Sequence, residues 1–561
     1  MINIPFLPIA LYAETHFRFW GWSPSLLFRK DPEIIFDLPR RLVPEYKYLP
    51  LALLVNDIHK YPVQIESIQI TLSQNGGKPK ILDFSKDDIE KSLLNHPLEK
   101  QMNAFILNIP RSEFALGELF VNACLKYRKI KKGRVGKRIT TVLNDNLVTS
   151  TKLPFRCFIA DEKYPGYEQC GFGDVHSHSQ FSRSHVEFGP PIEMIDKMCA
   201  ACGLNFAAVT DHSYDLACLP EDYLRQDKEL RLWGMYRAEM ARYDHPVSFA
   251  DTPGNGTVII IPGEEISVVN NRGDVVHLCG LGISEYIPGT LDGARKNVHF
   301  KKQLTIKEAV DEVNRQGGVS FAAHPGSQAG LMQRFFLGRG NWEEQDLIEG
   351  LGGIQAVNSG FFESWKRGKD LWISMLQKGH KIPILAGSDA HGDFNRYRAV
   401  GKPFLQIYEG AERYMGFVRT GIYGKPKNFK GSKDIIDGIK NCATFLTNGP
   451  FVSICDSRFP NEPLIRSKPI SDDNAKNLCV RAQSTKEFGT INTVKVFMGI
   501  PNVNGENIIL KHISEPDTYD VNLPIPYDML TEKCYLRIEA EGRTARGLPT
   551  AAVSSACFIG Y

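Results

Sequence analysis

The feature that most constrains the fold of this chain is a pair of histidines, His176 and His178, at the end of a short apolar segment. Side chains at positions i and i+2 of a β-strand point to the same face, so the two imidazoles can bind one metal ion. An isolated His-x-His pair is weak evidence, because two surface histidines can occur by chance. The pair therefore has to be weighed together with the residues that end other predicted strands.

Ligand-type residues follow several other segments that are apolar or β-branched and that we predict to be strands. These residues are His212, Glu265, His277, His324, Asp389 and His391. The carboxyl ends of the strands of a parallel α/β barrel meet at one end of the barrel and build a site there. Predicted strands and helices alternate from about residue 171 to about residue 400, which favours a parallel α/β barrel.

The residue types at these positions indicate metal binding. Imidazole nitrogens favour zinc, iron and related transition metals, whereas carboxylates favour hard cations and can bridge two ions. With His185, the set holds seven of the 14 histidines of the chain and two carboxylates, which is more than one ion can use. Three ions with shared ligands and open positions for water would use them all. We therefore predict a polynuclear metal site.

The order of these motifs resembles that of the PHP (polymerase and histidinol phosphatase) superfamily of metal-dependent hydrolases. The family pattern is His-x-His, Thr-Asp-His, Gly-x-Glu, two separated histidines and Asp-x-His. The matching residues are His176, His178, Thr210-Asp211-His212, Gly263-Glu264-Glu265, His277, His324 and Asp389-Ala390-His391. The resemblance covers roughly residues 170–400 and implies a distorted seven-stranded, TIM-like (β/α)7 PHP barrel. The flanking segments look more loosely like those of the carbaryl-hydrolase-like branch.

The resemblance also implies which residues share an ion, with two or three divalent ions (Zn, Mn or Fe) in all. The first ion would be held by His176, His178, Glu265 and Asp389. Glu265 would bridge to a second ion, completed by His277 and His324. His185, His212 and His391 would hold the third. Glu264 competes with Glu265 for the bridging role, and the Gly-x-Glu spacing and strand alternation favour Glu265.

A metal site of this kind predicts hydrolysis without a protein nucleophile. Two ions lower the pKa of a bridging water from about 15.7 towards neutrality, and the resulting hydroxide attacks phosphorus or an acyl carbon. We assign the catalytic groups to Glu265, Asp389 and His391. Arg183 and Arg396 are candidates to hold a phosphate group, and Asn358 is a candidate to line the pocket. Ordinary surface and core roles stay open for these last three residues.

Composition excludes some classes of partner. The formal net charge of +3 is too small to indicate binding to nucleic acid or to an anionic membrane. No run of eighteen apolar residues is present, so we expect no membrane contact. The twelve cysteines form no dense framework and are typical of a cytoplasmic protein with reduced thiols. The apolar residues 1–13 favour a first strand over a signal peptide. The expected partner is a small-molecule ester substrate, and an oligomer is possible.

The chain divides into three predicted domains. Residues 1–168 are β-rich and sandwich-like, residues 169–430 are the PHP metallohydrolase barrel, and residues 431–561 form a second β-rich domain. In the first domain, residues 119–130 and 139–148 are predicted to form a long hairpin. Eight basic residues lie in the segment 126–138; we interpret them as a solvated hairpin tip rather than an anion-binding arm. In the barrel, residues 220–243 form either a lid or a plain outer helix.

Three functions follow in order of preference. The first is a metal-dependent phosphoesterase that acts on a small phosphorylated molecule. The second is hydrolysis of a carboxyl ester, carbamate or amide at the same metal site. The third, from a different class, is a binding protein without catalysis whose metal ions only stabilise the fold.

Overall fold

The computed structural model of the 561-residue chain describes most of its length. The described residues are 31–74, 76–146, 153–182, 189–243, 258–289, 304–331, 334, 338–358, 363–392, 394–395, 399–402, 405–408, 414–465, 469–531 and 533–560. The predicted strand in residues 1–13 lies outside them, as do three predicted site residues, Arg183, His185 and Arg396.

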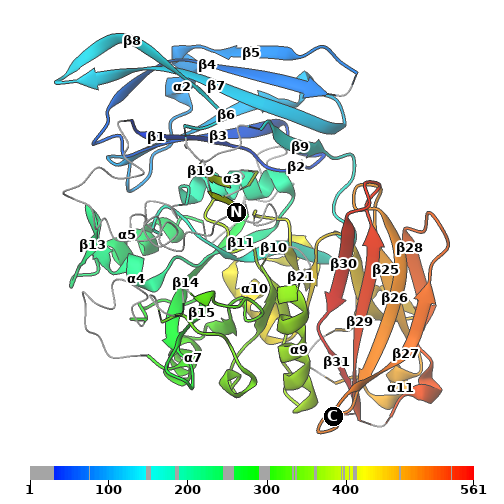
Figure 1. Ribbon diagram of the computed structural model, residues 1–561. Helices are drawn as coiled ribbons and strands as arrows, with labels where there is room; N and C mark the ends of the chain where they lie inside the picture. The colour runs from blue at the N-terminus through cyan, green and yellow to red at the C-terminus, as the bar shows by residue number, and fades with distance from the viewer. Residues whose placement is uncertain are drawn as a thin grey trace.

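Two β-sheets make up the N-terminal part of the chain and lie at the top of the molecule (Figure 1). The smaller sheet contains β1 (Glu33–Asp37), β3 (Tyr48–Asn56) and β6 (Met102–Pro110). The larger sheet contains β2 (Arg41–Leu42), β4 (Val63–Gln74), β5 (Lys80–Phe84), β7 (Gly117–Lys131), β8 (Arg134–Leu143) and β9 (Phe155–Ile159). A short helix, α2 (Lys86–Lys91), follows β5. Burial alternates along β7, so one of its faces packs into the core.

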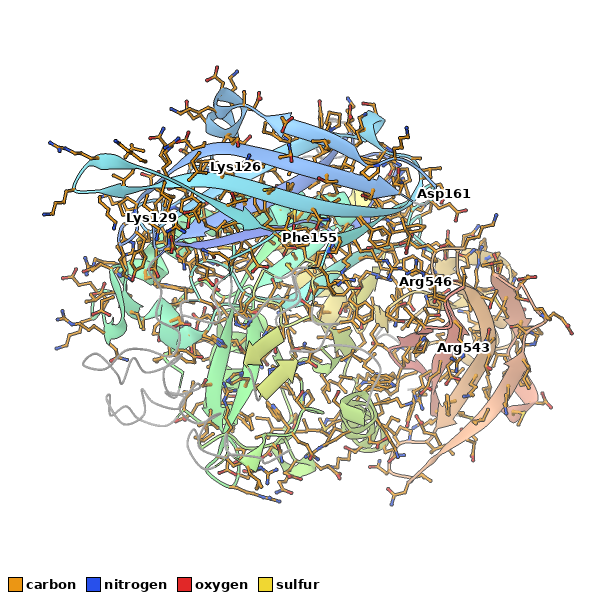
Figure 2. All side chains as sticks on the ribbon, turned by 45° about the horizontal axis from the view of Figure 1, so that its top comes forward. Lys126, Lys129, Phe155, Asp161, Arg543 and Arg546 are labelled. Carbon is orange, nitrogen blue, oxygen red and sulfur yellow. The ribbon has the colours of Figure 1, made fainter. Side chains whose placement is uncertain are left out.

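The predicted long hairpin is present as β7 and β8, which pair antiparallel. Lys132 and Gly133 form its turn with φ values of 46° and 73°, so β8 begins five residues earlier than predicted. Figure 2 labels Lys126 and Lys129 on this sheet, whose hairpin projects beyond the rest of the molecule. Lys129 forms an ion pair with Asp31 at 2.6 Å. A solvated, partly paired hairpin therefore accounts for its basic residues.

The middle of the chain contributes eight strands of a 14-stranded sheet. Its strands, in spatial order, are β18 (Ile384–Ala386), β17 (Ile354–Val357), β16 (Val319–Ala322), β15 (Val275–Leu281), β14 (Ile259–Val269), β11 (Phe206–Val209), β10 (Cys170–Ser177) and β21 (Arg419–Tyr423). Two pairs of short strands lie apart from it, β12 (Cys218–Leu219) with β13 (Asp222–Gln226), and β19 (Ala399–Lys402) with β20 (Leu405–Tyr408).

The predicted (β/α)7 barrel is wrong for this structure, in which strands greatly outnumber helices among the described residues. The sheet mixes parallel pairs such as β10–β11 and β11–β14 with antiparallel pairs such as β14–β15 and β15–β16. The physical reason is the connection between β14 and β15, a five-residue loop with Gly273 at φ 81°. A parallel pair needs a long crossover, so a loop this short makes the two strands antiparallel neighbours.

Helices pack against the middle strands. They are α3 (Ile192–Cys202), α4 (Ser213–Leu216), α5 (Arg231–Met240), α7 (Ile306–Arg315), α9 (Glu363–Gln377) and α10 (Ser432–Lys440). The predicted ends of two of them are confirmed: α3 stops at Gly203, which has φ 92°, and the Thr305 side chain accepts from the Glu308 N–H in a capping box. Among the described residues, none of the helices combines the length and apolar character that a membrane span requires.

Helix α5 is an outer helix rather than a lid over the site. Its buried residues include Leu232, Trp233 and Tyr236. The Tyr236 hydroxyl lies 2.8 Å from the carbonyl oxygens of Val209, at the end of β11, and of Gly263, inside β14. The helix is therefore fixed to these two strands.

A separate apolar cluster forms the floor beneath the carboxyl ends of the middle strands. It is made of inward-facing residues of several strands, closed by three isoleucines of α10. Its members include Val175, Phe206, Ile261, Phe321, Leu385, Ile435, Ile436 and Ile439. Val175 directly precedes His176, so this packing positions the first residue of the histidine pair.

The C-terminal part of the chain adds strands to the same sheet and forms a second sheet beside it (Figure 1). The added strands are β22 (Thr444–Thr447), β30 (Pro549–Ser554), β29 (Cys534–Arg543), β26 (Thr490–Gly499), β27 (Glu506–Ile513) and β31 (Cys557–Ile559). The second sheet contains β24 (Phe459–Pro463), β23 (Phe451–Asp456), β25 (Leu478–Gln483) and β28 (Asp520–Pro524), with the short helix α11 (Asp472–Ala475). The predicted domain boundaries at 168 and 430 stay predictions.

Candidate metal centre

The segment that carries Asp389 lies against the end of β10, which carries the histidine pair. The Asp389 N–H donates to the His176 carbonyl at 2.9 Å, and the His178 N–H donates to the Ala390 carbonyl at 2.9 Å. Close approach at this point needs Gly387, because a Cβ there would lie 2.8 Å from the His176 Cβ. This backbone pairing brings the Asp389 carboxylate beside both imidazoles.

Glu265 enters the same space from the middle of β14. Its N–H lies 3.1 Å from the carbonyl oxygens of Thr210 and Asp211, so the strand is tied to the segment that carries His212. The Nδ1 atom of His212 is 2.8 Å from the Glu265 Oε2 atom. His277, on the neighbouring strand β15, is in contact with Glu265 through its Nδ1 atom. His324 Nε2 lies 3.2 Å from Glu265 Oε1.

The distances around the first group match the edges of a tetrahedron of ligands. The Nε2 atom of His176 lies 3.6 Å from Glu265 Oε1 and 3.4 Å from Asp389 Oδ1. The Nε2 atom of His178 lies 3.4 Å from Glu265 Oε2 and 3.3 Å from Asp389 Oδ1. Four ligand atoms at about 2.1 Å from a tetrahedral ion are about 3.4 Å from one another. These separations exceed a good hydrogen bond and fit a shared cation.

Three overlapping groups of side chains place their ligand atoms within 4.8 Å of one another. They are His176 with His178, Glu265 and Asp389; Glu265 with His277 and His324; and His178 with His212 and His391. Glu265 has two oxygens and can serve two groups, but one imidazole nitrogen ligates one ion. If His178 belongs to the first group, the third keeps His212 and His391 among the described residues. His185, the predicted third ligand there, lies outside them.

Burial and unused polar atoms support the same interpretation. His176, His178 and Glu265 are buried. Within the described residues, the Nε2 atoms of both histidines and the Oε2 atom of Glu265 take part in no hydrogen bond. Burial alone would raise the pKa of Glu265 and of Asp389, but the surrounding histidines hold both pKa values well below the usual range. Buried ligand atoms that point at one another without hydrogen bonds are costly unless a cation joins them. These buried groups could therefore hold a metal ion.

Backbone strain coincides with two of the ligand-type residues. His324 has φ 34° and Asp389 has φ 56°, both in the left-handed region that residues with a Cβ rarely adopt. Each such conformation costs of order 1–3 kcal/mol and persists where the surroundings impose it, often at functional sites. The strained backbone is consistent with side chains that are held in place for a purpose other than packing.

Gln355, from the middle of β17, sets the tautomer of His176. The Gln355 Nε2 atom donates to the Gly387 carbonyl at 2.9 Å, so its Oε1 atom is left as an acceptor. That oxygen lies 2.8 Å from His176 Nδ1, which must therefore carry the proton. The lone pair of His176 is then on Nε2, the atom that faces Glu265 and Asp389. An outer hydrogen bond of this kind is what a metal-binding histidine uses to fix its orientation.

We expect Gln355→Leu to lower the affinity for metal about 10–100-fold, because the imidazole of His176 loses the group that orients it. Gln355→Glu keeps an acceptor for the Nδ1 proton and should retain more of the affinity. Competition with a chromogenic chelator measures both values. Equal affinity in wild type and Gln355→Leu would contradict the proposed role of Gln355.

Two buried aspartates beside the ligand-type residues, Asp211 and Asp174, accept from backbone N–H groups and, among the described residues, do not contact an imidazole directly. Asp211 accepts from the backbone N–H groups of Ser179 and Ser182 at 2.8 and 3.0 Å and from the Ser179 hydroxyl at 2.6 Å. Ser182 in turn contacts His178 Nδ1 at 3.0 Å, so Asp211 supports that imidazole only indirectly. Asp174 accepts from the backbone of His176 and Ser388, and burial raises its pKa to about 6.

The structure brings the described ligand-type residues together and separates Glu264 from them. Glu264 is buried away from the histidines and accepts from the Ile287 N–H at 3.3 Å, and burial raises its pKa well above the usual range. Asn358, at the end of β17, is buried, and its Nδ2 atom finds no partner among the described residues. A role for Asn358 in substrate binding stays a prediction.

Sequence reasoning missed two residues beside this cluster. Cys279 of β15 is buried and interacts with His176, and burial raises the pKa of its thiol to about 11. Arg339 places its Nη1 atom 3.2 Å from His277 Nδ1. Its segment is held beside β15, since the Val275 N–H donates to the Gly338 carbonyl and the Gly340 N–H donates to the Val275 carbonyl, both at 2.8 Å. The only signal in the sequence was the short Gly338-Arg339-Gly340 motif.

Comparison with known proteins adds little to this geometry. No family model matches the chain, and no curated protein matches it. Among solved structures, the chain is similar to the beta-glucuronidase of Bacteroides uniformis at 10% sequence identity, covering 94% of this chain and 60% of that one, with a TM-score of 0.16. The chain thus spans about 60% of the length of that protein. A likeness at this TM-score supports no conclusion about fold or activity.

Proposed function

We propose that this chain is a metal-dependent hydrolase that cleaves an ester bond of a small phosphorylated substrate. The observation that carries the proposal is the position of Glu265, which belongs to two ligand groups at once. A purely structural zinc site is closed by four protein ligands. Here His277 and His324 add a second, three-residue group to the first, which leaves coordination positions for water and substrate.

Ions bound here would supply Lewis-acid chemistry, because divalent cations lower the pKa of water from about 15.7 towards neutrality and polarise a phosphoryl oxygen. The side chains contribute the fixed geometry. Glu265 and Asp389 provide the negative charge that holds cations in a buried site, and the histidines set the distance between the two groups. The ring of His391 stacks on that of His178, with 4.1 Å between the ring centroids. His391 would complete the ligand-type residues from the same loop as Asp389.

Arg339 supports the choice of a phosphate ester. A guanidinium beside a cation site offers donors in a planar fork that suits the oxygens of a phosphate group. Its proximity to His277 places positive charge next to the second ligand group. A neutral carboxyl ester or carbamate would gain less from this charge.

The described residues suit two ions, and a third would depend on His185. The mixed imidazole and carboxylate ligands suit zinc, manganese or iron. We further propose that the chain is related to the PHP superfamily, on the strength of the order of its motifs. Cytoplasmic location, and any oligomer, stay predictions.

We expect the purified full-length chain to contain about two transition-metal ions and to release phosphate from p-nitrophenyl phosphate. Treatment with a chelator should abolish release, and Zn²⁺, Mn²⁺ or Fe²⁺ should restore it, because hydrolysis needs the bound cation. Elemental analysis and a phosphate assay measure these results.

Two outcomes would contradict the proposal. Release of naphthol from a naphthyl carbamate, with no action on phosphate esters, would assign the site to carbamate hydrolysis. Metal content without turnover of any ester, with a lower melting temperature after chelation as the only effect, would show that the ions stabilise a binding protein.

A further inference from the structure

A second feature of the molecule lies where the N-terminal, middle and C-terminal strands meet. It is a cavity of about 690 Å³, a size typical of small-molecule sites. None of its lining residues belongs to the metal groups. The lining includes six cationic side chains, Arg40, Arg41, Arg156, Arg419, Lys486 and Arg546, and two carboxylates, Glu118 and Glu487. Positive charge is therefore in clear excess.

The two carboxylates are already engaged by three of the arginines. Arg41 donates through Nε to both oxygens of Glu487 at 2.9 Å. Glu118 is shared, since Arg156 contacts its Oε1 atom and Arg546 its Oε2 atom. One carboxylate between two guanidinium groups leaves a net positive charge at this wall of the cavity.

Arg419, at the start of β21, is the residue that most needs an anion. Its side chain is buried, with 2% of the residue exposed. Its Nη1 atom donates to the carbonyls of Gly416 and Phe417 at 2.8 and 3.3 Å. Within the described residues, its Nε and Nη2 atoms meet no hydrogen-bond partner. Glu487 is close enough to favour the charged form of Arg419, but that carboxylate is already bound by Arg41. A buried guanidinium whose N–H donors are not all paired is unfavourable.

Aromatic rings hold this guanidinium in place without neutralising it. The centre of the Arg419 guanidinium lies 4.3 Å from the ring centroid of Tyr164 and 5.2 Å from that of Phe488. Arg41 lies 4.4 Å from the same Tyr164 ring. Cation–π contacts offset part of the cost of burial but do not satisfy the N–H donors. Burial lowers the pKa of Arg419 as a result.

We propose that this cavity is a second binding site, separate from the metal centre, for a small oxyanion with two or more negative charges, of the phosphate class. Guanidinium groups offer paired N–H donors that match phosphate oxygens, and the free Nε and Nη2 atoms of Arg419 form one such pair. The shared Glu118 leaves the guanidinium groups of Arg156 and Arg546 able to contribute charge from the opposite part of the lining.

The test uses titration calorimetry of the full-length chain with inorganic pyrophosphate. Arg546→Gln removes a cavity charge and leaves the Arg156–Glu118 pair, and Arg419→Gln removes the buried guanidinium. Arg543→Gln is the matched control, because Arg543 is the last residue of β29, three residues before Arg546, but does not line the cavity. Figure 2 labels both residues, with Arg546 nearer the N-terminal sheet. A Glu265→Gln background separates this site from the metal centre.

In the Glu265→Gln background the cavity should still bind pyrophosphate, and adding Arg419→Gln should weaken that binding at least about 10-fold, the loss expected for hydrogen bonds to a charged group. Arg546→Gln should weaken binding several-fold and Arg543→Gln should change it less than about twofold. If Arg419→Gln does not fold, the pyrophosphate affinities of Arg546→Gln and Arg156→Gln test the proposal in its place. Three results would each overturn the proposal. They are no binding of pyrophosphate to wild type, equal losses of binding in Arg543→Gln and Arg546→Gln, and loss of binding only in Glu265→Gln.

Discussion

Glu265→Gln should lower both the affinity for metal and the hydrolytic activity more than about 100-fold. Substitution of a residue that only orients a metal ligand already lowers metal affinity or activity about 10–100-fold, and Glu265 is proposed to be a ligand itself. The carboxylate of Glu265 faces five histidines and belongs to two ligand groups. An amide has one oxygen acceptor and no charge, so it can serve one group at most and cannot neutralise a pair of cations. Elemental analysis and the p-nitrophenyl phosphate assay measure the two losses.

The neighbouring residue supplies the control for this prediction. Glu264 is equally buried but lies away from the histidines, and burial raises its pKa well above the usual range. Glu264→Gln keeps the size of the side chain and an oxygen that can accept from the Ile287 N–H. We expect it to keep the metal and the activity close to those of the wild type. Retention of metal and activity in Glu265→Gln would contradict the assignment of Glu265 as the shared ligand.

The candidate site could be predicted from the sequence much better than the fold. Alternation on a strand places His176 and His178 on one face whatever sheet the strand joins, and a site at strand ends needs only that those ends meet. The described ligand-type residues do meet, although the strands around them are of mixed direction. The residues therefore meet without a closed parallel barrel, and not all of them are at strand ends, because Glu265 lies in the middle of β14 and His277 near the start of β15.

The error in the fold has a source that was visible in the sequence. Asn270, Asn271 and Gly273 lie between two apolar runs that are only five residues apart, which is a turn signal. That signal favours a hairpin between β14 and β15 over a helical crossover. The resemblance to a barrel family outweighed it. The continuation of the sheet through β21 into the C-terminal strands had no comparable signal, because strand order depends on long-range pairing.

Two functional details depended on contacts that a sequence does not show. Gln355 is an amide within the otherwise apolar run of β17, and such a residue signals a buried hydrogen bond without naming its partner. Only the structure shows that the partner is His176, 179 residues earlier. Arg339 follows a glycine outside any regular element, so nothing local places it beside His277.

Arg537→Met should lower the free energy of unfolding by about 3–5 kcal/mol, the range for a buried ion pair that loses one partner. Arg537 is 2% exposed and donates to Glu506 through Nε at 2.8 Å and through Nη2 at 2.6 Å. It also contacts Glu539, and its guanidinium lies 3.9 Å from the centroid of the Phe497 ring. The substitution takes this cation away from Glu539, which is buried, and from Glu506, whose side chain is 8% exposed. Urea unfolding measures the loss.

Lys495→Met is the control, because Lys495 pairs with Glu541 at 3.2 Å between the same two strands but with side chains that are 23% and 52% exposed. Its loss should lower the free energy of unfolding by less than about 1 kcal/mol.

The difference in the free energy of unfolding between wild type and Arg537→Met should also depend on pH. Burial raises the pKa of Glu539, but Arg537 and Lys369 outweigh burial and lower it below its ordinary value.

A carboxylate whose pKa is lowered by folding stabilises the protein above its unfolded-state pKa, about 4.3 for glutamate, and the stabilisation is lost as the pH falls through the lower folded value. We therefore expect the difference in the free energy of unfolding between wild type and Arg537→Met to have its largest value at neutral pH and to decrease below about pH 4. A difference that is constant from neutral to acidic pH would show that Arg537 stabilises the C-terminal sheet through its packing on Phe497 rather than through its charge.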